Sequence, residues 1–279
     1  MIIIKTEKEI AIIRQGGKIL ANILKKLIAE VKPGVTTGHL EKMACELIKQ
    51  AGGRPSFKGY KSMHDAQGFP TALCASINNE VVHAPAIPSR RLNTGDIIDI
   101  DIGMEYPIFA TQSRGIAADR PVNADSEMGG YYTDMSATTP VGKISKQAKK
   151  LINVTRKSLE LAIKQVKPGN SLNDIGKAIQ QYVESQGFSV VRDLVGHGVG
   201  VAVHEEPQVP NYEIANPKDN IILKPGMVIA IEPMVNIEDW KVKNGKDGFT
   251  IVTADGSLSA HFEHTVAVTE KGCRVLTFL

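Results

Sequence analysis

The sequence predicts an α/β fold of two related halves that face each other across a pseudo-twofold axis. Two matches within the chain carry this prediction. The segment at 31–52 is similar to the segment at 166–187, and both begin VKPG and end in a glycine. The apolar segments at 94–101 and 225–232 also match, and each ends on an acidic residue. Matched segments at similar offsets indicate an internal repeat.

A third match brings a second acid to each half. Asp134 lies in YYTDMSATTP and Glu263 in HFEHTVAVT, and they follow Asp101 and Glu232 at similar distances along the chain. We therefore expect one site between the halves that receives two acids from each. The expected single domain spans residues 1–279, with halves of about 1–140 and 141–279.

Four helices are predicted from capping residues, apolar residues at intervals of three and four, and Gly or Pro at the ends. Thr6 and Glu9 fit a capping box before the first helix, and Ser171 and Asp174 resemble one before the last. Lys-Pro-Gly segments follow the first and third helices, and glycines follow the other two. The predicted helices span about residues 7–30, 37–51, 145–165 and 171–186.

The strands are predicted from Ile- and Val-rich or alternating segments. The predicted strands lie within 70–100, 190–205, 227–236, 248–253 and 262–268. Residues 104–130, between the strands of Asp101 and Asp134, lack clear periodicity. We interpret this insertion as an extended hairpin or loop. It is either a solvated segment without function or an element at the rim of the site.

The composition is that of an ordinary globular protein. With 42% hydrophobic and 23% charged residues, the chain is not collagenous, low-complexity or broadly disordered. A net charge of +3 gives no indication of sequence-specific nucleic-acid binding. Three cysteines without paired spacing favour a reducing compartment. The apolar stretch at the N-terminus is too short for a signal peptide, and no apolar segment is long enough to span a membrane. We therefore expect a cytoplasmic protein.

Acids within apolar strands give the strongest indication of function. Asp99 and Asp101 alternate in GDIIDIDIG and so share a face, and Glu232 lies in the apolar run MVIAIEPMV. A buried carboxylate is costly unless it is paired or binds a metal. One such acid alone is typical of a salt-bridged core residue. Four acids on repeat-related strands favour a metal site.

Two histidines extend the candidate ligand set. His197 lies in GHGVG and His204 begins HEEPQV. A single histidine is usually structural, but glycines beside it leave room for a ligand. Carboxylates with imidazole suit Mn, Fe, Co or Zn better than Cu(I). Four carboxylates suit two bridged ions better than one, and such pairs can activate water and polarise a carbonyl.

Several short motifs, in order, resemble type I methionine aminopeptidases of the pita-bread fold family. The resemblance extends over nearly the whole chain, from residue 4 to residue 269. It implies a pita-bread fold with a central curved antiparallel sheet. The motifs are NNEVVH at 78–83, GDIIDID at 95–101, GHGVG at 196–200, HEEPQV at 204–209, AIEPMV at 230–235 and HFEHT at 261–265.

The resemblance implies a set of site residues. Asp134 and Glu263 would bridge two divalent ions, Asp101 would bind one ion, and His197 and Glu232 would bind the other. Glu232 would also help to activate the bridging water as general base, and the resulting hydroxide would attack the first peptide bond. His204 would stabilise the tetrahedral intermediate, and His83 would contact the substrate or leaving group. Phe69, Cys74 and Phe249 would line the methionine pocket, although core packing explains each of these three equally well.

The chain departs from the family pattern in two places. The family joins the strands of Asp101 and Asp134 by a short hairpin, whereas the long insertion separates them here. Asp119 and Asp125 within it are therefore further candidate ligands, but only Asp134 lies in the expected YYTDMS context. The segment from Met63 to Phe69 also differs from the aromatic-rich family form, so the side-chain preference stays open.

The expected function is removal of the N-terminal methionine from nascent polypeptides. The expected cofactors are two divalent ions, drawn from Co, Mn, Fe and Zn, and the expected protein is a monomer with transient ribosome association. Two alternatives stay open. One is a proline-directed aminopeptidase or dipeptidase with the same ligands. The other is a protein of the same fold that has lost its metals and binds RNA or protein partners.

Overall fold

The structure is a computed structural model that describes residues 1–61, 67–108, 129–216, 218 and 220–278. Most of the predicted insertion at 104–130, including Asp119 and Asp125, lies outside the described residues, as does Met63. Three residues at the start of the insertion, 104–106, continue a long strand.

All four predicted helices are present, with ends that differ from the prediction by no more than about two residues. The Thr6 side chain accepts a hydrogen bond from the Glu9 N–H, and the Glu9 carboxylate accepts one from the Thr6 N–H. The Asp174 carboxylate accepts from the N–H and the hydroxyl of Ser171, both at 2.7 Å. These contacts satisfy N–H groups at the helix starts. The helices are α1 (Glu7–Glu30), α2 (Thr37–Gln50), α3 (Lys146–Ile163) and α4 (Leu172–Ser185).

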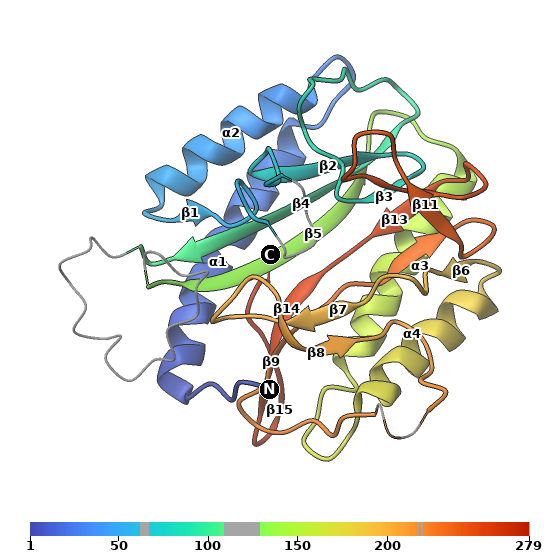
Figure 1. The fold of residues 1–279 in the computed structure, drawn as a ribbon. Helices are drawn as coiled ribbons and strands as arrows, with labels where there is room; N and C mark the ends of the chain where they lie inside the picture. Colours follow the sequence, from blue (N-terminus) through green and yellow to red (C-terminus); the bar gives the residue numbers. More distant parts are fainter. Residues whose placement is uncertain (62–66, 109–128, 217, 219, 279) are drawn as a thin grey trace.

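The strands of the described residues form four antiparallel sheets (Figure 1). The first contains β1 (Arg54–Pro55), β2 (Leu73–Ile77), β4 (Ile97–Tyr106) and β5 (Tyr131–Pro140). The second has the order β15 (Gly272–Val275), β14 (His264–Thr269), β9 (Val228–Ile231), β7 (Gly196–Gly198) and β8 (Glu205–Val209). The third joins β11 (Val242–Asn244), β12 (Ile251–Thr253) and β3 (Glu80–Val82), and the fourth β13 (Ser259–His261), β10 (Met234–Asn236) and β6 (Ser189–Val190).

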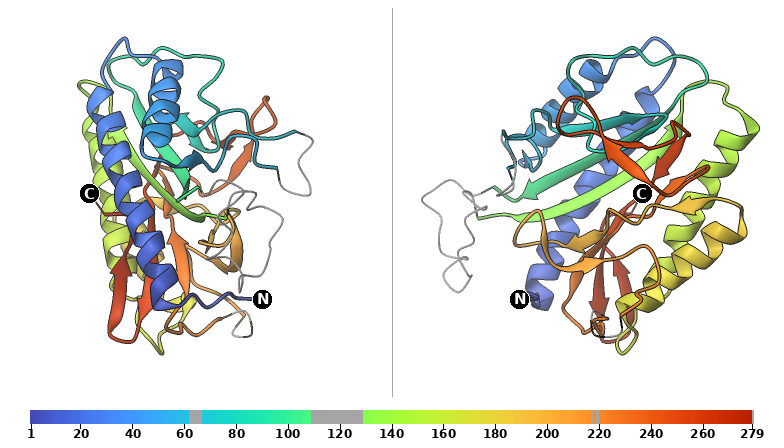
Figure 2. Two further views of the ribbon diagram at one scale, coloured as in Figure 1. Left: turned by 90° about the vertical axis from the view of Figure 1, so that its left-hand side faces the viewer. Right: turned by 45° about the vertical axis from the view of Figure 1, so that its right-hand side comes forward.

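Helices α1 and α3 lie on one side of the strands (Figure 2). Helix α1 packs against β4 and β5, and α3 packs against β13, β10 and β9. The spacing of Leu20, Leu24 and Leu27 places all three on the buried stripe of α1, where they join one core cluster with Ile100 and Ile102 of β4. A second core cluster lies between α3, α4 and the C-terminal strands. Each helix pair therefore covers the strands of its own half of the sequence.

The two halves meet along β5. The Thr265 hydroxyl accepts from the Asp134 N–H at 3.0 Å and donates to the Asp134 carbonyl at 2.7 Å. The Glu263 N–H donates to the Ser136 carbonyl at 3.1 Å. These contacts fix the acid-bearing strand of one half against that of the other.

The segment predicted as strand at 190–205 is less regular than expected. Only short pieces of it pair, in β6 and β7. Its glycines leave no room for side chains. A Cβ on Gly196 would overlap the carbonyl oxygen of Ala230, and one on Gly198 would overlap that of Glu206. The segment therefore packs closely against neighbouring main chain and does not form a long strand.

Replacing Thr265 by Val should lower the free energy of unfolding by about 2 kcal/mol. The change keeps the side-chain shape but removes both buried hydrogen bonds to Asp134. Thr269→Val is the matched control, because Thr269 of the same strand bonds main-chain groups of its own hairpin near solvent. Thr269→Val should lower the free energy of unfolding by only about 0.5 kcal/mol. Urea unfolding of both variants checks the difference, and equal costs would contradict the assigned role of Thr265.

Candidate metal centre

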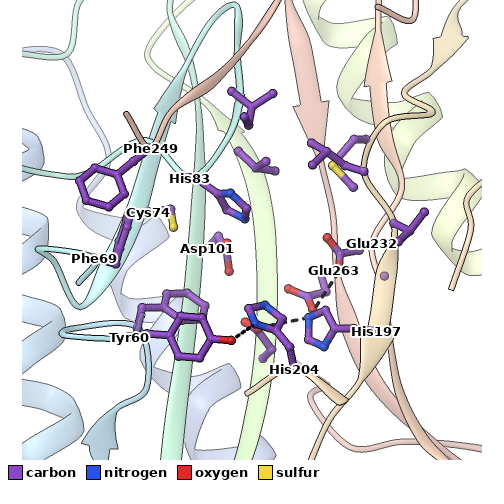
Figure 3. A pocket seen from close by; sticks show the side chains of 18 of the residues that line it. Tyr60, Phe69, Cys74, His83, Asp101, His197, His204, Glu232, Phe249 and Glu263 are labelled. Carbon is purple, nitrogen blue, oxygen red and sulfur yellow. Dashed lines mark hydrogen bonds and ion pairs between the residues drawn. The ribbon is translucent and has the colours of Figure 1, made fainter. Parts of the chain in front are cut away.

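The ten site residues that the family resemblance implies all line one pocket of about 800 Å³. In Figure 3 acidic and imidazole groups lie at one end, and Phe69, Cys74 and Phe249 lie at the other. The predicted residues that line the pocket are Phe69, Cys74, His83, Asp101, Asp134, His197, His204, Glu232, Phe249 and Glu263.

Strand pairing brings two acids together in the first half. On β4 and β5, Asp101 is opposite Ser136 and Asp134 is opposite Gly103. Residues two apart on a strand share a face, so both carboxylates point to the same side of the ladder. Asp101 is 7% exposed and Asp134 5%.

The second half supplies the other two acids and the imidazole. Glu232 directly follows β9, Glu263 directly precedes β14, and the ladder places His264 opposite Ile231. Both acids therefore leave the ladder at the same end. His197 lies on β7, which pairs with β9.

The His197 ring is oriented toward the acids. Its Nδ1 lies 2.9 Å from the Gly198 carbonyl oxygen, which fixes the proton on Nδ1. Its Nε2 lies 3.5 Å from Glu232 Oε1 and 4.0 Å from Asp134 Oδ2. An imidazole held in this way presents the Nε2 lone pair to a metal ion.

The donor set fits divalent ions. Ligand atoms of Asp134, His197 and Glu263 all lie within 4.8 Å of one another. Among the described residues, Asp101 Oδ1, Asp134 Oδ1 and Glu263 Oε1 are buried and accept no hydrogen bond. Buried carboxylate oxygens without partners are costly, and metal coordination removes that cost. Oxygen and imidazole donors suit the first-row divalent metals.

Crowding of the acids changes their protonation. Burial raises the pKa of Asp101 to about 7 and that of Glu232 to about 8, while His261 opposes both shifts. Burial and neighbouring carboxylates raise the pKa of Asp134 and Glu263 well above the usual range. A bound cation favours the ionised forms, so metal binding is coupled to proton release.

His204 and His83 lie at the edge of the acidic cluster. The His204 ring is 4.4 Å from that of His197, centroid to centroid, and its Nδ1 lies 2.8 Å from the Tyr60 hydroxyl. Burial lowers the pKa of His204 well below its usual value, so the ring is neutral. His83 directly follows β3 with a positive φ of 59°.

The turn before His204 is held by a buried ion pair. The Lys5 ammonium pairs with the Glu205 carboxylate, and both side chains are almost fully buried. The same carboxylate accepts hydrogen bonds from the N–H groups of Val201 and Ala202. The N-terminal segment thereby fixes the loop that carries His204.

Aromatic rings form the apolar end of the pocket. Phe69 and Phe249 meet edge to face with centroids 5.5 Å apart. Cys74 of β2 pairs opposite Asp101, which places its thiol between the rings and the acids. Burial, with the nearby Asp101 charge, raises the pKa of this thiol well above its usual value, so it stays protonated.

The sequence analysis missed several residues of this region. Phe57 and Tyr60 line the pocket, and only the FKGY stretch before Phe69 could have indicated them. The analysis noted Asp99 but gave it no partner. In the structure Asp99 lies 3.2 Å from His261 Nδ1, a contact between the two halves that no local pattern predicts.

Comparison with known proteins identifies the family. The model of metallopeptidase family M24 matches residues 11–123 and 107–270. The chain belongs to metallopeptidase family M24. It is 45% identical to methionine aminopeptidase 1 of Bacillus subtilis over 99% of both chains. It is 39% identical to the methionine aminopeptidase of Escherichia coli K12, over 98% of this chain and 93% of that one.

Solved structures of M24 relatives have the same fold as this chain. Methionine aminopeptidase from Thermotoga maritima is 40% identical, with a TM-score of 0.86 over all of both chains. A prolidase from Pyrococcus horikoshii, 22% identical, shares the fold with a TM-score of 0.70 over 99% of this chain and 63% of that one. The predicted family and pita-bread fold are therefore confirmed. Among the described residues, no helix is long and apolar enough to cross a membrane.

The metal-free protein should lose stability as the pH rises from 6.5 to 8.5. Asp101 and Glu232 keep protons in the folded state up to pKa values of about 7 and 8, whereas unfolded carboxyls release theirs near pH 4. The folded state thus binds more protons, so its stability is full at low pH and falls through this window. Each proton held contributes a slope of about 1.4 kcal/mol per pH unit.

Urea unfolding in chelator at the two pH values measures this loss, expected at about 3 kcal/mol for the two carboxyls together. The stabilisation added by Mn(II) should instead grow with pH, because the ligands must be deprotonated. A metal-free protein that becomes more stable at pH 8.5 would contradict the buried, partly protonated cluster.

Proposed function

We propose that this chain is a methionine aminopeptidase that hydrolyses the first peptide bond of proteins and peptides with an N-terminal methionine. The observation that carries the proposal is a single pocket with four acids and His197 at one end and an apolar aromatic wall at the other. Relatives of that activity match the chain over nearly its full length. The two ends of the pocket suit the two parts of the substrate, a scissile peptide bond and an apolar side chain.

The proposed cofactors are two divalent ions held by five residues. Asp134 and Glu263 would be shared by both ions, Asp101 would bind one, and His197 and Glu232 would bind the other. Bound ions of this kind polarise a carbonyl and lower the pKa of water. The orphaned oxygens of Asp101, Asp134 and Glu263 support this set. Co, Mn, Fe and Zn are all compatible with it.

The protein side chains supply the proton transfers. In the proposed mechanism the Glu232 carboxylate takes a proton from the attacking water and passes it toward the leaving amine. The Tyr60 hydroxyl lies 2.8 Å from His204 Nδ1. We assign this contact to a hydrogen bond that Tyr60 donates, which places the N–H of the neutral ring on Nε2. That N–H stabilises the negative charge that develops on the carbonyl oxygen. His83 contacts the substrate or the leaving group.

The apolar end is proposed to select methionine. Phe69 and Phe249 stand at right angles, and the Cys74 thiol lies near them. Soft, unbranched side chains such as that of methionine pack well against aromatic rings. The free α-amine lies toward the acids, which makes the enzyme an exopeptidase.

The remaining assignments rest on the same proposal. The chain acts as one catalytic domain, 1–279, in the cytoplasm, as a monomer. Its partners are N-termini of nascent polypeptides, met during transient ribosome association. No membrane or sequence-specific nucleic acid takes part.

Metal-dependent release of methionine from Met-Ala-Ser tests the activity. Protein stripped with chelator should be inactive and regain activity with Mn or Co. Leu-Ala-Ser should stay intact because it lacks the methionine side chain. N-acetylated Met-Ala-Ser should stay intact because it lacks the free α-amine. Release from Ala-Pro-Ser alone would instead assign a proline-directed activity. No release with any metal would overturn the enzymatic assignment.

His204→Ala should lower kcat about 100-fold with little change in metal content, because the ring acts on the carbonyl oxygen and binds no metal. Tyr60→Phe should lower kcat about tenfold, since it removes only the hydroxyl that sets the His204 proton. His39→Ala, on the exposed side of α2, is the control. Steady-state kinetics with metal analysis separates these outcomes, and a loss of metal in His204→Ala would make His204 a ligand instead.

A further inference from the structure

His261, the last residue of β13, lies beside the acidic cluster but has no role in the proposed reaction. Its side chain is 2% exposed. Its Nδ1 lies 3.2 Å from Asp99 Oδ2 and 3.0 Å from Ser136 Oγ. Its Nε2 lies 3.8 Å from Glu232 Oε2. The ring thus stands between a carboxylate outside the pocket lining and one that lines the pocket.

The ring is held firmly from both halves of the chain. The His261 N–H donates to Thr138 Oγ1 at 2.9 Å. The same hydroxyl lies 2.9 Å from the His261 carbonyl oxygen and 3.2 Å from Asp99 Oδ1. The main chain and the side chain of His261 therefore belong to one buried hydrogen-bond network with Asp99. This network leaves the ring little freedom to turn.

The far side of the ring points to a specific partner. Among the described residues, His261 Nε2 is buried and makes no hydrogen bond. A buried nitrogen without a partner is costly, and Glu232 Oε2 faces it at just over hydrogen-bond distance. The two ring nitrogens thus face carboxylate oxygens of Asp99 and Glu232 on opposite sides of the ring. A small shift of the Glu232 side chain completes the second hydrogen bond.

We propose that Asp99 and His261 are positioning residues that orient the Glu232 carboxylate and thereby raise the affinity of the ion held by His197 and Glu232. Asp99 fixes the ring, and the ring fixes one oxygen of Glu232. The other oxygen, Oε1, lies 3.5 Å from His197 Nε2 and stays available for the ion. Hydrogen bonds that orient metal ligands typically contribute a 10- to 100-fold gain in metal affinity.

This inference deepens the proposed function and rests on its ligand set. Calorimetric titration of the metal-free protein with Mn(II) is the direct test, because it does not depend on turnover. The wild type should bind two equivalents. In His261→Leu one of the two should bind about 10- to 100-fold more weakly, with the other within about threefold of the wild type.

Three further variants make the test specific. His261→Gln keeps a donor toward Glu232 and should retain most of the affinity. Asp99→Asn keeps the shape but removes the counter-charge and should weaken the same ion about tenfold. The double variant, Asp99→Asn with His261→Leu, should bind no more weakly than His261→Leu alone, because Asp99 acts through the ring. If His261→Leu does not fold, Asp99→Asn and His261→Gln still decide the matter.

His264→Leu is the matched control. This half-buried histidine lies on the neighbouring strand β14, with its Nδ1 3.2 Å from Thr277 Oγ1. Its loss should affect stability but leave both metal affinities within about threefold. Wild-type affinities in Asp99→Asn and His261→Leu would overturn the inference and leave the proposed function standing. A wild type that binds no Mn(II) would overturn the proposed function as well.

Discussion

The burial of four carboxylates at one point limits how this fold can be built. Asp101, Asp134 and Glu263 are each less than a tenth exposed, and Glu232 stands beside them. Such a cluster is unfavourable for a protein without metal, because its charges repel one another and lack water. The fold must therefore hold the acids by contacts that do not involve their charges. The antiparallel ladders of β4 with β5 and of β9 with β14 supply those contacts.

The seam between the halves determines the distances across the site. Within each half, the strand register fixes the positions of its two acids. The distance between the two pairs of acids depends on contacts between the halves. The Thr265 hydroxyl hydrogen-bonds both the main-chain N–H and the carbonyl of Asp134. The Thr138 hydroxyl makes the same two contacts with His261. Both contacts link β5 to the segment around Glu263. The positions of the four acids relative to one another therefore depend on the contacts that Thr265 and Thr138 make between the halves.

The sequence was informative wherever function and local pattern coincide. Capping boxes, apolar spacing and terminators predicted all four helices, and acids inside apolar strands predicted the cluster. The strand expected around residue 197 is shorter than predicted, because Gly196 and Gly198 of β7 pack closely against neighbouring main chain. The contact of His261 with Asp99 and the approach of Tyr60 to His204 depend on tertiary packing between distant segments. No periodicity records such contacts.

The histidines around the acidic cluster differ in protonation, and their surroundings cause the difference. Burial lowers the pKa of His197 to about 4, so its Nε2 is free to bind a metal ion. His204 is neutral for the same reason, and its Nδ1 lies 2.8 Å from the Tyr60 hydroxyl. Burial acts in the same direction on His261, but Asp99 and the other acids outweigh it and raise its pKa to about 9. His197 and His204 are thus neutral and His261 is charged, and the distinction lies in whether a carboxylate faces Nδ1.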